Sequence, residues 1–177
     1  MMRACRLPAL LLASACSLSP WATAADNVRL HGALVAEPCV IPPGDESVAL
    51  DFGTVIDKYL YQYQRTPGKT FELRLAECDL SLGNTLTVTL GGVENPKLPG
   101  LLALAAGSGA GGVAIGIETP QGRPLPLNRP GEKYPLQAGS TVLRLQAYVQ
   151  GEPQALAEKK LVRGAFSAVA TFQFEYQ

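Results

Sequence analysis

Short runs in which apolar and polar residues alternate are the feature that most constrains the fold of this chain. Strand-like runs follow one another at 28–35, 48–52, 71–75, 85–90, 112–119, 141–149 and 168–176. A period of two is typical of half-buried strands. The 18 glycines and 14 prolines are spread between the runs instead of forming one linker. About seven strands at this spacing, with no internal repeat, predict a single all-β, immunoglobulin-like sandwich.

The first 24 residues have the pattern of a secretory signal peptide. Arg3 and Arg6 precede the apolar run 7–13, and Ala22-Thr23-Ala24 forms a small-residue cleavage site. The apolar run is shorter than the roughly 20 residues that a membrane-spanning helix needs. We therefore expect cleavage after Ala24 and export of the remaining chain, with no membrane span.

Two of the four cysteines, Cys39 and Cys78, lie beyond the signal peptide. Because disulfides persist in exported proteins, we predict that these two cysteines pair. A redox or nucleophilic thiol is the alternative, but the chain has no Cys-x-x-Cys and its one histidine, His31, lies in a strand-like run. A second alternative concerns Ala13–Cys16, which loosely resembles a lipoprotein cleavage site, although Ala13 stands where leucine is usual.

Composition argues against several functional classes. Fifteen basic residues balance 15 acidic ones, and loss of Arg3 and Arg6 leaves a slightly acidic chain without the basic surface of a nucleic-acid-binding protein. The single histidine and the absence of G-x-S-x-G give no basis for an enzyme, a metal site or a cofactor. A carbohydrate-binding module stays open, because Tyr59, Tyr61 and Tyr63 alternate along one face. We favour a strand face or a subunit contact for these tyrosines.

Helix signals are weak. Residues 155–159 and 101–106 could each form about one turn, and the glycine- and alanine-rich stretch 101–112 is expected to be a loop.

Both ends of the mature chain carry strand-like runs with one apolar face. Because side chains alternate along a strand, Val28, Leu30, Gly32 and Leu34 share a face. At the other end Ala168, Ala170, Phe172, Phe174 and Tyr176 share a face. Both runs could be ordinary strands of the chain's own sandwich.

The whole mature chain resembles pilin subunits of the chaperone–usher pathway, in the type 1 fimbrial class. The resemblance rests on the extension 25–35 shortly before Cys39, on the run 48–55, on the Cys39/Cys78 pair and on the terminal pattern of Gly164 to Tyr176. It implies an incomplete sandwich that lacks its last strand and is completed by a donor strand from a partner. The implied domains are a signal peptide at 1–24, a donor-strand extension running into the first strand at 25–36, and a pilin domain at 37–177.

The resemblance also assigns roles to residues. Val28, Leu30, Gly32 and Leu34 would form the donor face that fills a neighbour's groove, with His31 on the opposite face. Contact with this subunit's own groove and with the periplasmic chaperone would come from Gly164, Phe172, Phe174 and Tyr176. Strand addition of this kind combines backbone hydrogen bonds with side-chain pockets.

The implied function is that of a structural fimbrial subunit supporting cell adhesion. Its partners would be other pilin subunits, a periplasmic chaperone and an outer-membrane usher, and its final location a fimbrium on the cell surface. The short extension and the single domain favour a minor or adaptor pilin. A major shaft subunit, an assembly terminator and a secreted carbohydrate-binding sandwich are the alternatives.

Overall fold

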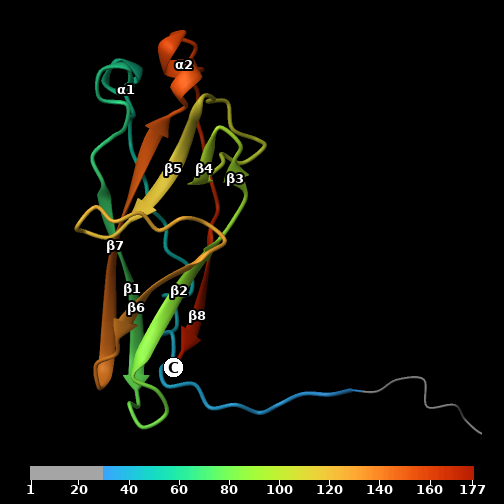
Figure 1. Ribbon diagram of the computed structural model, residues 1–177, viewed down its shortest axis with the longest axis vertical. Helices are drawn as coiled ribbons and strands as arrows, with labels where there is room; N and C mark the ends of the chain where they lie inside the picture. The colour runs from blue at the N-terminus through green and yellow to red at the C-terminus, as the bar shows by residue number, and fades with distance from the viewer. Residues whose placement is uncertain (1–29) are drawn as a thin grey trace, which may run out of the picture. The chain divides into compact units, whose positions relative to one another are not determined.

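Two antiparallel sheets pack against each other in the computed structural model, which describes residues 30–177 (Figure 1). The larger sheet has the order β1 (Lys69–Cys78), β7 (Gly139–Gly151), β5 (Val113–Glu118), β4 (Leu98–Leu102) and β3 (Glu94–Asn95). The smaller sheet has the order β6 (Pro130–Pro135), β2 (Thr85–Gly91) and β8 (Thr171–Tyr176). All these strands belong to one compact unit, Val35–Gln177, which we call the body. The predicted immunoglobulin-like class is confirmed.

The core lies between the inner faces of the two sheets. Pairing of β1 with β7 runs from Lys69 opposite Ala147 to Cys78 opposite Gly139. Alternate residues of these strands point inward and are buried, as the sequence predicts: Leu73, Leu75, Leu143 and Leu145 from this pair, and Leu86, Val88 and Leu90 from β2. Deeply buried leucine and valine side chains provide most of the hydrophobic stabilisation, at roughly 1.5–3 kcal/mol each.

The predicted disulfide is present. Cys39 and Cys78 are bonded and both are almost fully buried. Around the bond, Val40 and Ala76 exchange backbone hydrogen bonds, and the Asp79 amide donates to the Pro38 carbonyl. The segment that enters the body is thereby fixed to β1.

Two predicted strands do not form. Residues 30–35 of the run 28–35 adopt no helix or strand, and 28–29 lie outside the described residues. Residues 48–52 are also without strand structure, although Leu50 and Phe52 are half-buried while their neighbours are exposed. The alternation is therefore real, but neither run has a pairing partner among residues 30–177. β4 occupies the start of 101–106, where a helical turn seemed possible.

The helix α1 (Asp57–Tyr63) was not predicted, and the interpretation of Tyr59, Tyr61 and Tyr63 as a strand face is wrong. Tyr59 and Tyr63 are one helical turn apart, and their rings contact each other in a tilted arrangement with centroids 4.4 Å apart. The Tyr61 hydroxyl instead accepts a hydrogen bond from the Leu161 amide. Leu60, which is 3% exposed, is the buried residue of α1 and faces the core, as one side of an amphipathic helix does.

The short helix α2 (Pro153–Ala157) agrees with the turn expected near 155–159. Figure 1 shows α1 and α2 at one end of the body, whereas the turn between β1 and β2 lies at the opposite end. No helix in residues 30–177 is long and apolar enough to cross a membrane.

Candidate strand-binding groove

A groove runs along the body between two extended segments that are not paired with each other. One wall is the stretch 47–55, and the other is the stretch 164–174, which leads into β8. Four cavities follow one another along this line and share lining residues at each junction. The groove is therefore continuous from Phe174 at one end to Leu60 at the other.

The part of the groove nearest the chain's C-terminus is wide. Its cavity has a volume of about 510 Å³ and lies between Val48 on one wall and Phe172 and Phe174 on the other. The next cavity is smaller, about 130 Å³, and its floor includes Phe71 and Ile117 of the larger sheet. The floor of the groove is thus formed by apolar residues of the sandwich core.

A third cavity, of about 520 Å³, lies between the Phe52 and Phe166 walls. The two phenyl rings approach each other to a centroid distance of 6.1 Å. Aromatic side chains from the two walls therefore contact each other across the groove at this position.

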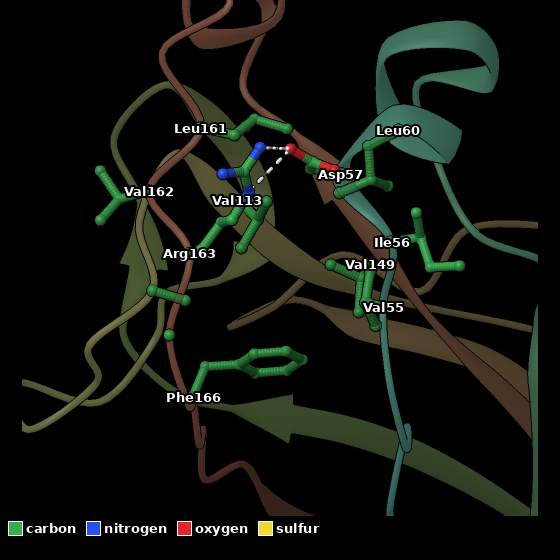
Figure 2. A pocket seen from close by; sticks show the side chains of 12 residues that line it. Val55, Ile56, Asp57, Leu60, Val113, Val149, Leu161, Val162, Arg163 and Phe166 are labelled. Carbon is green, nitrogen blue, oxygen red and sulfur yellow. Dashed lines mark hydrogen bonds and ion pairs between the residues drawn. The ribbon is translucent and has the colours of Figure 1, made fainter.

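The last cavity ends the groove and has a volume of about 190 Å³ (Figure 2). Figure 2 shows Leu60 and Val149 on one side and Leu161 and Phe166 on the other, with Val113 between them. Apart from Asp57 and Arg163 at its mouth, its lining side chains are apolar, so that it suits a branched aliphatic side chain.

An ion pair lies across the mouth of this end cavity. The Asp57 carboxylate accepts hydrogen bonds from Nε and Nη2 of Arg163 at 3.0 and 2.6 Å, as the dashed lines in Figure 2 mark. The Arg163 guanidinium lowers the pKa of the Asp57 carboxyl, an effect that partial burial opposes. Together with the hydrogen bond from Leu161 to Tyr61, the pair joins α1 to the opposite wall.

The walls also present backbone groups without partners. On the 164–174 wall, Ala165 and Ser167 carbonyls accept bonds from the loop 105–110, which lies on the side away from the groove. Within residues 30–177, the amides and carbonyls of Phe166, Ala168 and Ala170 have no hydrogen-bond partner. β8 is an edge strand of the smaller sheet, so its groove side continues this row.

An apolar floor beside a row of unpaired backbone groups is suited to binding an added strand. Unpaired strand edges take up further strands readily, and alternate side chains of the added strand can enter pockets. No group of three or more histidine, cysteine or carboxylate residues in the described chain is arranged for a metal ion. The geometry therefore favours binding of an extended peptide.

The sequence-derived groove residues have different locations. Phe172 and Phe174 line the groove, and the alternation that identified them is observed. Tyr176 packs on the core but lines none of the four cavities, and burial raises the pKa of its phenol. Gly164 lines the last two cavities. A Cβ at Gly164 would lie 2.5 Å from the Gly109 carbonyl carbon, so glycine is required there by close backbone approach.

The residues proposed for the donor face are not part of the body. Leu30, Gly32 and Leu34 lie in a segment with no helix or strand, and both leucine side chains are exposed. Val28 lies outside the described residues. Sequence reasoning missed Leu60 and Phe166 as lining residues, and it interpreted 48–52 as a paired strand. The half-buried alternation of Leu50 and Phe52 was the signal available for the second wall.

Comparison with known proteins finds similarity to fimbrial proteins in both the family model and the individual relatives. The model of the family described as fimbrial protein matches residues 28–177. The Fimbria A protein of Serratia marcescens is 30% identical over 167 residues, which cover 90% of this chain and 91% of that protein. The fimbrial adapter PapK of Escherichia coli is 31% identical over 175 residues, covering 96% and 97%.

A solved structure, that of the P pilus rod subunit PapA, has a TM-score of 0.68 with this chain at 23% identity. The matched region covers 80% of this chain and 100% of the PapA chain. At this identity the structural likeness concerns the fold.

Proposed function

Because the chain belongs to the fimbrial protein family, we propose that it joins the fimbrium by strand exchange, its groove receiving the N-terminal extension of a neighbouring subunit. It is a structural fimbrial subunit that assembles with other subunits at the cell surface. Its own extension, residues 25–36, fills the groove of a second neighbour in this proposal. The role is structural throughout and involves no catalysis.

The open groove is the observation that carries the proposal. Its apolar lining is unfavourable to leave in water, and the unpaired backbone groups at Phe166, Ala168 and Ala170 form an open strand edge that can pair with another chain. An added strand satisfies both features at once, since its backbone pairs with the wall and its side chains cover the floor. The extension has the required period of two and no partner within its own described chain.

The spacing of the extension supports one direction of insertion. Alternate residues of a strand are about 6.6–6.8 Å apart, so Val28, Leu30, Gly32 and Leu34 occupy successive positions along a groove. Gly32 has no side chain and suits the position where the rings of Phe52 and Phe166 approach each other across the groove. If Gly32 takes that position in an antiparallel strand, Leu34 reaches the apolar end cavity and Leu30 and Val28 reach the two cavities beyond.

Before assembly, we propose, a periplasmic chaperone occupies the same groove and an outer-membrane usher exchanges it for the extension. Phe172 and Phe174 line the cavity nearest the C-terminus of this chain, and they would contact the chaperone strand there. Tyr176 and Gly164 would support the wall, because the first packs on the core and the second permits close approach to the loop at Gly109.

We further propose a minor or adaptor position in the fibre. Similarity to the fimbrial adapter PapK over almost the whole length supports this position, as does the 28% identity to the putative minor fimbrial subunit PmfF of Proteus mirabilis. Counting copies per fibre by quantitative mass spectrometry of sheared fimbriae tests it. A chain that makes up most of the fibre mass would be a shaft subunit instead.

The strand-exchange proposal is tested by placing a charge on each face of the extension. Leu30→Asp should prevent this subunit from inserting into its neighbour, because a carboxylate would enter an apolar cavity. The matched control is His31→Asp, which introduces the same charge on the opposite face and should assemble normally. Immunoblotting of sheared fimbriae measures the outcome. Normal incorporation of the Leu30→Asp chain would refute the donor-face assignment.

A further inference from the structure

We propose that Lys69 is a positioning residue for the groove, because its ammonium group holds the 47–55 wall toward β1 and keeps the groove open to a strand. The role rests on the proposed strand exchange and is independent of which subunit supplies the strand. It lies in this chain's own wall, before any strand has entered.

The 47–55 wall is held at its two ends but not through its own backbone. Before the wall, Val40 is paired with Ala76 beside the disulfide, and after it the Ile56 carbonyl accepts the first backbone hydrogen bonds of α1. Between these points, no amide or carbonyl of the wall is bonded to another backbone group of the described chain. The position of the wall therefore depends on side chains.

Lys69 makes the one hydrogen bond that joins this wall to another part of the body within residues 30–177. Its ammonium group donates to the carbonyl of Asp51, in the middle of the wall. The wall's other hydrogen bond is local, since the Gly53 amide donates to the Asp51 carboxylate at 2.8 Å. Lys69 takes part in none of the ion pairs of the described chain. Its charge therefore acts on the Asp51 carbonyl, and charged donors form the stronger hydrogen bonds.

Packing alone does not fix the wall, because cavities lie on both of its faces. The groove side carries the cavity of about 520 Å³ between the two walls. A separate cavity of about 390 Å³ lies between the wall and residues 66–69, and none of its lining residues belongs to the 164–174 wall. Leu50 and Phe52, which anchor the wall on the core, are only half-buried. The wall therefore has space to move in either direction.

The order of the strands gives the direction in which Lys69 acts. Lys69 begins β1, the edge strand of the larger sheet, and the floor of the groove crosses from β1 to β5. At the far side of this floor, the 164–174 wall is bonded to the loop 105–110, which leads into β5. A hydrogen bond to β1 therefore draws the 47–55 wall away from the opposite wall.

Without Lys69 we expect the two walls to approach each other. Phe52 and Phe166 already face each other across the groove with ring centroids 6.1 Å apart, and closure would remove more of their apolar surface from water. An incoming strand would then have to reopen the groove before its side chains could enter the cavities. Binding to a preformed site avoids this rearrangement, so Lys69 favours strand binding without touching the strand.

Three lysine variants of the full exported chain, isolated as the monomer, test this role. Lys69→Gln removes the charge, whereas Lys69→Arg keeps a cationic donor. The matched control is Lys133→Gln, because Lys133 is an exposed lysine of β6 that is likewise outside the ion pairs. The probe for strand binding is a fluorescent synthetic peptide of residues 25–36.

The separation of the walls is measured in the same variants by electron paramagnetic resonance. Spin labels are attached at Ala49→Cys and Val169→Cys, because these exposed residues lie on the two walls. Cys39 and Cys78 are bonded to each other and do not take up the label. This distance reports the position of the wall independently of peptide binding.

We expect Lys69→Gln to bind the peptide about fivefold more weakly, as loss of one hydrogen bond predicts, and its labels to lie closer together over a wider range of distances. Lys69→Arg and Lys133→Gln should match the parent chain in both measurements. Equal peptide affinity in Lys69→Gln would overturn the role of Lys69 and leave strand exchange intact. Weaker binding with an unchanged label distance would also overturn it, because Lys69 would then contact the strand directly. If the parent chain binds no peptide, the proposed strand exchange and the role of Lys69 are both wrong.

Discussion

The two long sides of the body carry the same sequence pattern and have opposite structures. On the closed side, β1 and β7 alternate apolar and polar residues and pair from Lys69 opposite Ala147 to Cys78 opposite Gly139. On the open side, 48–52 and 166–172 alternate in the same way, with Leu50, Phe52, Phe166 and Phe172 half-buried, yet the two stretches flank a groove and do not pair. The period of two therefore predicts which face of a segment is apolar. It does not predict whether this chain or another chain covers that face.

The difference between the closed and the open side also determines which residues contribute fully to the stability of the isolated chain. Leu143 and Leu145 on the closed side are 5% and 1% exposed, so their contribution is complete within this chain. On the open side, the proposed strand exchange would complete the contribution of the groove residues with a strand from a neighbouring subunit. A fold divided in this way couples its stability to its assembly.

The largest expected effect comes from the disulfide that fixes one wall of the open side to the closed side. In Cys39→Ala/Cys78→Ala, the residues between the two positions gain freedom in the unfolded state, which in the chain-entropy model lowers the free energy of unfolding by about 4 kcal/mol. Urea unfolding measures the change, and free-thiol titration of the exported parent chain is the control. A double variant as stable as the parent would show that packing alone holds the wall.

A pair of core variants sharpens the comparison directly. Leu145→Ala on the closed side should cost about 2–5 kcal/mol, because a fully buried leucine leaves a cavity. Phe172→Ala should cost less in the free chain, since its ring is only half-buried against Phe71 and the core. The measurement is urea unfolding with and without a saturating synthetic peptide of residues 25–36.

The peptide separates the two sides. Stabilisation by the peptide should be unchanged in Leu145→Ala and clearly reduced in Phe172→Ala, because only the second residue contacts a strand in the groove. Equal peptide stabilisation in both variants would mean that the peptide binds elsewhere.

Much of the fold follows from the sequence, and the reasons differ between elements. β1, β2, β5 and β7 were predicted because alternation and pairing agree within the chain. The strand β3 was missed because it has only two residues, and β4 and β6 were missed because they contain proline and glycine. α1 was missed because three alternating tyrosines mimic a strand face, and only Leu60 between them indicates the helical period.

One part of the groove could be predicted from the sequence and another part could not. Phe172 and Phe174 of the 164–174 wall could be found from their alternation, since they belong to a strand of this chain. The end cavity could not, because Leu60, Val113, Val149 and Phe166 are far apart in the sequence and meet only in the folded body. Asp57 and Arg163, more than 100 residues apart, are joined in the same way.

The smallest expected effect on stability concerns the ion pair between Asp57 and Arg163. Like the disulfide at the opposite end of the body, this pair links distant segments, but it contributes less to the free energy of unfolding. Because Arg163 lowers the pKa of Asp57 below its usual value of about 3.9, the charged pair stabilises the folded chain above that value. The contribution is lost as the pH falls through the lowered pKa of the folded state. The stability difference between the parent chain and Asp57→Asn should therefore be present at neutral pH and vanish in acid.

A carboxyl titration by NMR tests the cause. In Arg163→Gln the pKa of Asp57 should rise toward its usual value, because the guanidinium that lowers it is gone. Arg123→Gln is the matched control, since Arg123 is an exposed arginine whose partner is Glu132, and it should leave the Asp57 titration unchanged. If Asp57 titrates alike in all three chains, the pair does not hold α1 to the opposite wall, and the end of the groove is closed by Tyr61 and packing alone.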